Sequence, residues 1–224
     1  YILSKKINQS FNIKFPIGFL NIGGITNKTK VINNSDNFQN DLSAFDVGPG
    51  NCLIDEWVRN NSYKKFDKNG ELAIAGKVDQ LILNQAIDNF KINSYSQSLD
   101  IKDFDVSFAR GLSLEDGCAT ITNFTGYLIA QGLNHISQKD NITFLVCGGG
   151  RKNNNLVNCI KYYLADGNKI NLEMIDNYNL DGDYIESQAF GLLAIRSFLN
   201  LPISFPATTG CKEPTIGGKL VENF

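Results

Sequence analysis

The sequence predicts an α/β fold. Apolar runs of about six residues, the length of a buried strand, alternate with segments whose apolar residues recur at helical spacing. The chain has 224 residues, of which 42% are hydrophobic and 20% charged. This composition is globular and supplies enough apolar residues for a substantial core.

Composition excludes several classes of protein. The net charge of −2 indicates neither a nucleic-acid nor an anionic membrane partner. No apolar run is long enough to cross a bilayer, and no signal peptide is visible. The cysteines are odd in number and form no CxxC pair, so we expect reduced thiols in a cytoplasmic protein and no metal site. They are Cys52, Cys118, Cys147, Cys159 and Cys211.

The first strands are predicted directly after a polar lead-in of residues 1–16. Residues 17–22 form an apolar, β-rich run that Gly23 and Gly24 interrupt, and residues 29–32 predict a second strand. The pair resembles a hairpin. Its glycines suit a loop whose backbone contacts phosphate, although a plain β-turn is the simpler explanation of these residues alone.

Residues 44–51, Ala-Phe-Asp-Val-Gly-Pro-Gly-Asn, predict a strand, a turn and the start of a helix. Asp46 stands at the expected strand end, where it is a candidate general base or simply the cap of the next helix. Gly48, Gly50 and Asn51 form the turn. Glycines allow a close backbone approach to a ligand, and a helix start offers N–H groups to an anion.

Two helices are predicted in the middle of the chain. Apolar spacing predicts one over residues 76–89, and a second starts at residues 113–116 and runs to about Asn134. The single histidine, His135, ends this second helix, where a cation is favoured. A nucleophilic triad would depend on His135 alone, and no G-x-S-x-G motif accompanies it.

A second glycine turn follows the apolar strand predicted at residues 142–147. Gly148, Gly149 and Gly150 separate this strand from a helix, which makes the unit a candidate nucleotide site. It lacks both the G-x-G-x-x-G spacing and the GK[ST] of a P-loop. A dinucleotide-dependent oxidoreductase is therefore the weakest of the functions considered. Residues 170–175 predict a further strand.

Residues 181–186 open another predicted helix, whose packed side we expect to include Ala189 and Phe190. Asp183 and Glu186 are spaced as in a capping box. Equally, one of these two acids could face a cleft and bind sugar hydroxyls. The tail at residues 205–210 is expected to be a loop.

Six stretches resemble, in order, the anhydro-N-acetylmuramic acid kinase family, a family of sugar kinases within the actin/Hsp70/hexokinase (ASKHA) superfamily. Each is weak alone, but the sequences FDVGPGN, GDxxE and FPxTTG together are specific. The stretches are residues 21–27, 44–51, 53–57, 146–150, 182–190 and 205–210.

The resemblance implies a fold and an activity. The family fold has two RNase H-like lobes around a cleft, each a mixed β-sheet flanked by helices. The family opens the 1,6-anhydro ring of anhydro-N-acetylmuramic acid with water and phosphorylates O6 from ATP with Mg²⁺, in cell-wall recycling. Asp46 matches the catalytic base and Glu186 an acid that contacts the sugar. Asn21, Gly23 and Gly24 match a phosphate segment, and the turn at 148–150 matches the adenosine side.

Two departures from the family pattern matter. The glycine-rich first phosphate loop is absent, so residues 1–16 are expected to be a remnant of the first lobe and residues 17–224 the second lobe. A basic stretch of the family is also replaced, at residues 97–101, by Gln-Ser-Leu-Asp-Ile. A separately encoded first lobe and a second copy of the chain are the expected protein partners.

Two hypotheses of different class follow. The chain is part of a sugar kinase that turns over when the first lobe is supplied, or it is a non-catalytic remnant that binds nucleotide or sugar weakly. Loss of a single donor aimed at developing charge can cost about 3–4 kcal/mol in a preorganised site, so a missing lobe should abolish turnover.

Overall fold

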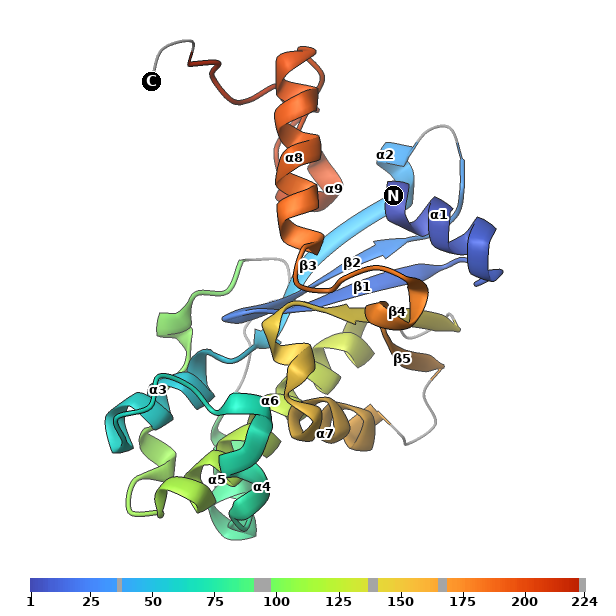
Figure 1. The fold of residues 1–224 in the computed structure, drawn as a ribbon. Coiled ribbons are helices and arrows are strands. Elements are labelled where there is room, and N and C mark those ends of the chain that lie inside the picture. The colour runs from blue at the N-terminus through green and yellow to red at the C-terminus, as the bar shows by residue number, and fades with distance from the viewer. Residues whose placement is uncertain (36–37, 91–97, 137–140, 165–168, 222–224) are drawn as a thin grey trace.

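The computed structural model describes residues 1–35, 38–90, 98–136, 141–164 and 169–221. It is built on a five-stranded sheet with the strand order β3-β2-β1-β4-β5 (Figure 1). Strand β2 is antiparallel to both β1 and β3, whereas β4 is parallel to β1 and β5 is parallel to β4. The bounds are β1 (Ile17–Ile22), β2 (Ile25–Val31), β3 (Leu42–Pro49), β4 (Ile142–Cys147) and β5 (Ile170–Met174). The predicted α/β class, with a mixed sheet flanked by helices, is confirmed.

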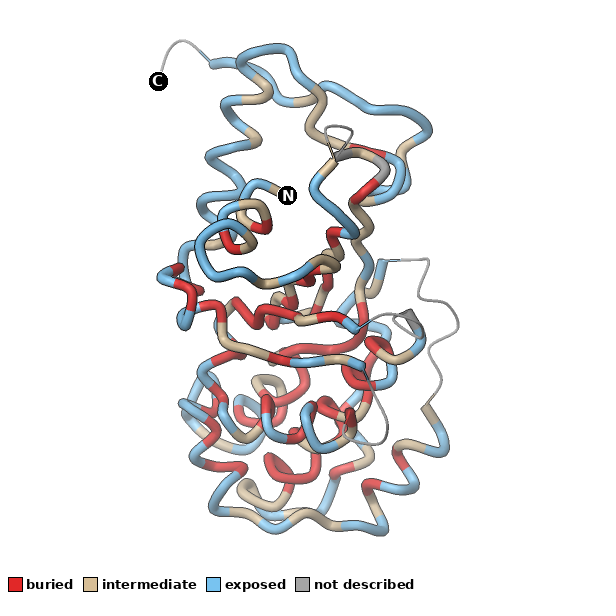
Figure 2. Tube along the Cα trace, turned by 90° about the vertical axis from the view of Figure 1, so that its right-hand side faces the viewer, coloured by how far each residue is buried: buried red, intermediate tan, exposed pale blue. Residues whose placement is uncertain are grey.

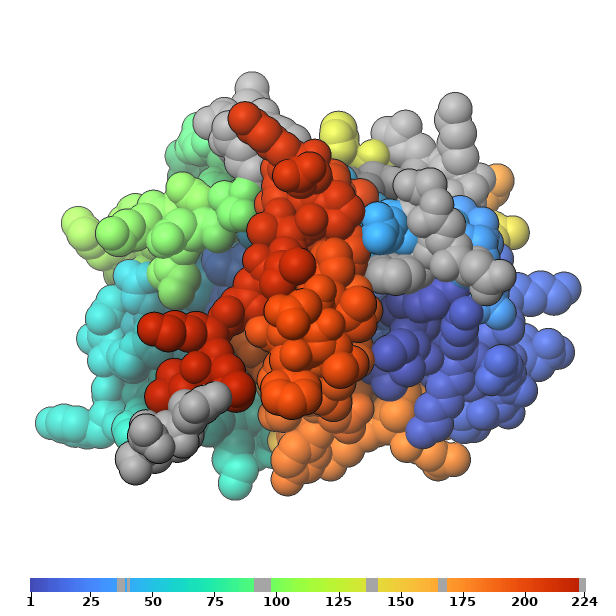
Figure 3. Space-filling view, turned by 90° about the horizontal axis from the view of Figure 1, so that it is seen from above, coloured from blue at the N-terminus to red at the C-terminus, as the bar shows by residue number. Residues whose placement is uncertain are grey.

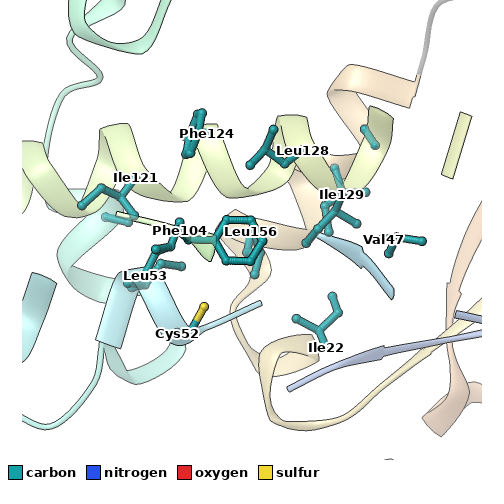
Figure 4. Packing of buried hydrophobic residues seen from close by; sticks show 14 of the residues in the cluster. Ile22, Val47, Cys52, Leu53, Phe104, Ile121, Phe124, Leu128, Ile129 and Leu156 are labelled. Carbon is teal, nitrogen blue, oxygen red and sulfur yellow. The ribbon is translucent and has the colours of Figure 1, made fainter. Parts of the chain in front are cut away.

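Helices α3 to α7 cover the face of the sheet that is lower in Figure 1. The long helix α6 packs across β3 and against α3, α4, α5 and α7. Side chains of α6 such as Phe124 and Ile129 meet those of the strands and α3 in one continuous apolar cluster (Figure 4). The bounds are α3 (Cys52–Asn61), α4 (Glu71–Ala75), α5 (Gln80–Asn89), α6 (Leu114–Ile136) and α7 (Asn154–Leu164).

The opposite, upper face is covered much less completely. Helix α1 (Ile2–Phe11) packs through Ile7 onto a small second cluster that includes Ile17 and Leu145. Helix α8 (Ile185–Phe198) stands above the sheet and contains no buried residue, as the pale blue upper half of Figure 2 shows. Two short helices complete this side, α2 (Phe38–Asp41) and α9 (Pro206–Thr209).

A bulge interrupts the pairing of β2 with β3. Asn27 pairs with Asp46, but the next residue back along β2, Thr26, pairs with Gly48. Val47 is therefore the extra residue on β3. Val47 packs in the lower core, and a Cβ on Gly48 would lie 3.3 Å from the backbone nitrogen of Ile129 in α6. The bulge thus turns two consecutive residues toward α6 while Asp46 stays on the upper face.

Most predicted elements are confirmed, with shifted ends. The strands at 17–22 and 142–147 and the long helix ending beside His135 lie as predicted. The hairpin is confirmed, although β2 begins at Ile25. The helix predicted from residue 76 begins only at Gln80, because Asp79 caps it by accepting a hydrogen bond from the Ile82 N–H (3.0 Å). Helices α1, α2, α4 and α9 were not predicted, and α9 lies within residues 205–210, which were expected to be a loop.

The predicted packed side of α8 was wrong. Phe190 is 65% exposed, and Ala189 is exposed too. Apolar spacing identifies a helix with an apolar side, but it does not say which element covers that side. Within the described residues, no layer packs over α8.

Candidate active site

Three polar side chains lie in a row across the upper face of the sheet. Asn21 of β1 pairs directly with Asn27 of β2, and Asn27 pairs with Asp46 of β3. Directly opposed residues of antiparallel strands have Cβ atoms about 5 Å apart and point to the same side. Cys147 of β4 continues the row beyond Asn21. We call Asn21, Asn27 and Asp46 the polar row.

Two pockets open above the polar row. The first, of about 440 Å³, lies over Asp46 and Ala44 of β3 and is closed by Ser98 and residues 206–210. The second, of about 560 Å³, lies between the start of α1 and the start of α8, and it includes Asn21 and Glu186. The pockets therefore bring together stretches that are far apart in the sequence, such as Tyr1 and Leu192 in the second pocket and Asp46 and Pro206 in the first.

Asp46 is half-buried in the middle of β3 and faces the first pocket. The interpretation of Asp46 as a helix cap was wrong, because β3 continues to Pro49 and Asn51 is the N-cap residue of α3. One carboxylate oxygen, Oδ2, accepts a hydrogen bond from the Leu99 N–H (2.9 Å). The segment that departs from the family pattern thus contacts Asp46, although Gln97 of that segment lies outside the described residues.

The two turns beside the polar row are bonded to each other. The Gly50 N–H donates to the Gly24 carbonyl and the Asn51 N–H to the Gly23 carbonyl, both at 2.8 Å. These N–H groups are therefore not free for an anion, contrary to the expectation for this helix start. A Cβ on Gly50 would lie 2.2 Å from the Gly23 oxygen, so only glycine allows this approach.

The β1–β2 turn keeps its own donors free. Within the described part of the chain, the N–H groups of Gly23 and Gly24 donate no hydrogen bond, and Gly24 is exposed. Two consecutive free N–H groups form the kind of backbone site that binds a phosphate. The role that remains for Gly50 and Asn51 is to hold this turn in place.

The turn at Gly148–Gly150 lies against β1. A Cβ on Gly148 would lie 2.2 Å from Oδ1 of Asn21, and one on Gly150 would lie 2.2 Å from Cγ2 of Ile22. Gly148 also has φ +80°, a value that favours glycine. Gly149 is exposed, with open space where its side chain would be. The structure thus brings this turn beside Asn21.

Arg151 is a structural anchor of the site that sequence reasoning missed. It is buried, and its guanidinium binds Asp176 (2.8 Å) and Asp183 (2.6 Å) and donates to the Gly148 carbonyl (3.1 Å). Hydrogen bonds to Asp176 and Asp183 raise the pKa of Arg151. In turn, Arg151 holds the pKa values of both acids below the ordinary range. The sequence did contain a signal for these ion pairs, because Arg151 and Lys152 follow the glycine turn and Asp-Gly-Asp occurs later, at residues 181–183.

The two acids near the start of α8 have different surroundings. Asp183 is engaged by Arg151 and by Lys152 (2.6 Å), which explains its position without a ligand. The capping box with Glu186 was a wrong interpretation, because Tyr184 is the N-cap residue and no side chain caps α8. Glu186 is exposed and lines the second pocket.

The other candidates have structural roles. His135 lies in the last turn of α6, as predicted. All five cysteines are free thiols, and burial raises the pKa of Cys147, beside Asn21, to about 12. In the described ranges no cluster of three His, Cys, Asp or Glu side chains could hold a metal ion, and no helix could span a membrane.

The chain is similar in sequence to several proteins that share one name. The chain is 51% identical over 223 residues to the anhydro-N-acetylmuramic acid kinase of Pelagibacter ubique, covering 97% of this chain and 58% of the relative. It is 35% identical to that of Brucella canis over 212 residues, covering 94% of this chain and 55% of the relative. The kinase of Rhizorhabdus wittichii is 38% identical over 204 residues, with 91% and 53% covered. The chain therefore spans little more than half the length of these relatives.

A solved structure also resembles the chain, at the low TM-score of 0.46 and 13% identity. It is the activator of the 2-hydroxyisocaproyl-CoA dehydratase from Clostridium difficile with bound ADPNP, and the match covers 86% of this chain and 67% of the activator. The sequence pattern of the anhydro-N-acetylmuramic acid kinase family matches residues 12–223. The chain therefore belongs to the anhydro-N-acetylmuramic acid kinase family.

Proposed function

We propose that this chain forms the nucleotide- and sugar-binding side of a kinase that converts 1,6-anhydro-N-acetylmuramic acid, ATP and water to N-acetylmuramic acid 6-phosphate and ADP. The observation that carries the proposal is the position of Asp46, half-buried in a pocket that residues 206–210 close. Asp46 and this segment belong to two of the family's matched stretches, 160 residues apart, and they meet at one site.

In this proposal Asp46 accepts a proton from the water that attacks C1 of the sugar. Its hydrogen bond from Leu99 occupies Oδ2, and Oδ1 accepts no hydrogen bond within the described residues. A carboxylate held by one oxygen leaves the other available to the water. Ring opening then frees O6, which takes the γ-phosphoryl group.

The glycine turns fit the nucleotide. The free N–H groups of Gly23 and Gly24 suit phosphate oxygens, while the turn at 148–150 lies beside them on the expected adenosine side. Mg²⁺ is commonly held by substrate phosphates with one or two carboxylates. In this proposal the phosphates held at the Gly23–Gly24 turn would supply most of the Mg²⁺ ligands, because the described residues contain no group of three His, Cys, Asp or Glu side chains that could hold the ion.

The test is phosphorylation of 1,6-anhydro-N-acetylmuramic acid in the presence of ATP and Mg²⁺. We expect Asp46→Asn to lower turnover by at least about a hundredfold, which is the usual contribution of a general base. Ser98→Ala, at the rim of the same pocket, is the matched control and should retain most activity. Normal turnover by Asp46→Asn would contradict the assignment of the base.

A second candidate function is a half-enzyme that binds ligands but needs a further lobe for turnover. The observation that favours it is the apolar surface of α8, where Phe190, Ile195 and Phe198 are each more than half exposed. Figure 3 shows α8 in orange across the top of the molecule. Calorimetric titration separates the candidates, because binding of ATP or sugar without turnover is the expected result for a half-enzyme.

We propose that the occupant of this α8 surface is the lobe that makes up the rest of the family's length. The relatives are longer by more than two fifths of their own chains, and an apolar helix of this kind is stable in water only when covered. Co-expression with the unmatched segment of the Pelagibacter relative should give a complex that Phe190→Glu abolishes. Leu81→Glu, exposed on α5, is the control. Self-association of the chain through α8 would contradict this choice of occupant.

A further inference from the structure

Asn27 is the one residue of the polar row to which neither the family resemblance nor the proposed function gives a role. It pairs with Asn21 on one side and with Asp46 on the other. Asparagine is depleted in strands, because it supplies little packing on a pleated surface. A residue that disfavours its local structure, at the centre of a candidate site, is expected to serve function there.

The two pockets meet at Asn27. Among the described residues that line them, Asn27 is the only one that belongs to both. Asp46 lies in the first pocket and Glu186 in the second. A sugar that contacts both acids, as the family resemblance implies, must therefore lie over Asn27.

The side chain of Asn27 is available to such a ligand. It is half-buried and makes no hydrogen bond within the described part of the chain. Its amide can both donate and accept, as a sugar hydroxyl or acetamido group also can. It does so without charge, so it neither repels the carboxylate of Asp46 nor competes with it for a proton.

We propose that Asn27 is a sugar-binding residue that holds the substrate between Asp46 and Glu186 through hydrogen bonds of its side-chain amide. This inference rests on the proposed function, and it assigns to that function a contact outside the acids and the glycine turns. Asn27 fixes where the ring lies relative to Asp46, and so it influences both affinity and the alignment of C1.

The test measures binding of 1,6-anhydro-N-acetylmuramic acid to the full 224-residue chain by calorimetry. We expect Asn27→Ala and Asn27→Thr each to weaken the affinity about tenfold, the loss expected for one or two neutral hydrogen bonds. Asn171→Ala on β5 is the matched control, since it makes the same change on a strand residue that lines neither pocket. Its affinity should stay within about twofold, because the change lies outside the proposed site.

A thermal melt separates a binding role from a structural one. Because the side chain of Asn27 forms no hydrogen bond within the described part of the chain and threonine favours strands, Asn27→Thr should keep or raise the Tm while it weakens sugar binding. In the unaltered chain, the side-chain amide resonance of Asn27 should shift when sugar is added, and that resonance is identified by its absence from the variants.

The outcomes are distinguishable. Unchanged affinity of Asn27→Ala, in a chain whose unaltered form binds the sugar, overturns this inference and leaves the proposed function standing. A weaker affinity that comes with a lower Tm in both variants assigns Asn27 a structural role and also overturns it. No binding by the unaltered chain contradicts the proposed function together with this inference.

Discussion

The two faces of the sheet differ in how completely they are built. The lower face is closed by five helices, and its core is continuous from α3 through α6 to α7. The upper face has a small cluster, two pockets and a helix with no buried residue. The candidate site lies entirely on the upper face. The main apolar core and the candidate site thus lie on opposite sides of the same strands, so substitutions on the two faces should have different consequences.

The largest difference is expected for a matched pair of isoleucines. Ile129 of α6 is fully buried in the lower core, whereas Ile195 of α8 is 59% exposed. Ile129→Ala should lower the free energy of unfolding by about 2–5 kcal/mol, because it leaves a cavity. Ile195→Ala should change it by less than about 0.5 kcal/mol. Urea denaturation measures both, and equal effects would show that α8 is covered in solution.

A matched pair of glycines should give effects of opposite sign. A Cβ on Gly132 of α6 would lie 2.2 Å from the Val47 carbonyl oxygen, while nothing lies within 4 Å of one on Gly191 of α8. Gly132→Ala should therefore destabilise the chain by about 1–3 kcal/mol. Gly191→Ala should stabilise it by about 0.5–1 kcal/mol, since alanine favours a helix interior. Thermal melts of the two variants provide the measurement, and a shared sign would refute the contrast.

Lys28 is an exception within the lower face. It is fully buried opposite Leu20 and Phe45, its Nζ has no hydrogen-bond partner in the described chain, and it lies 5.3 Å from the centre of the Phe45 ring. Lys28→Met should raise the free energy of unfolding by about 1–3 kcal/mol at pH 7, because it removes a buried charge that Phe45 only partly compensates.

The pH dependence gives a second test of Lys28. Burial, with a smaller contribution from Lys30, lowers the pKa of Lys28 from 10.5 to about 8. Between these values the unfolded chain holds a proton that the folded chain has lost, so stability should rise with pH from about 8 to 10.5. Lys28→Met should lack this rise. A rise that persists in the variant would have to come from another group.

The smallest effect on stability is expected for the exposed ion pair between Lys152 and Asp183, which precedes α8. Lys152 and Arg151 hold the pKa of Asp183 below its ordinary range, so their pairing stabilises the fold at neutral pH and is lost as the pH falls through that lowered pKa. Lys152→Gln should cost little at pH 7, since exposed ion pairs contribute weakly. It should cost nothing once the pH has fallen below that lowered pKa, because Asp183 is then protonated. Melts at pH 7 and over a series of acid pH values check this, and a loss that does not shrink as the pH falls would point to packing.

Sequence reasoning predicted well what is determined locally. The apolar runs of β1 and β4 and the periodic helix α6 carry their own signal, and all three were placed nearly to the residue. The position of Asp46 within β3 could not be predicted in this way. It depends on a bulge at Val47, and a register shift is fixed by pairing with another strand rather than by the residues of one strand.

The rest of the site was beyond local patterns for the same reason. The ion pairs of Arg151 join it to acids more than 20 residues away, and the polar row assembles residues from three strands. The error at α8 was different. Its apolar residues were identified correctly, but burial is a property of the partner as well as of the helix.

The ion pairs of Arg151 have a mechanical consequence. Arg151 directly follows the glycine turn, and it forms ion pairs with Asp176 and Asp183, which precede α8. The turn, these two acids and the first residues of α8 are therefore expected to move together. Helix α8 has 14 residues and is about 21 Å long, so a rotation at its first residues displaces its last residues the most. A tilt of a few degrees at its base is amplified at the tip, where Phe198 lies. Through these ion pairs, a displacement of the turn at residues 148–150 would be carried to the exposed apolar surface of α8.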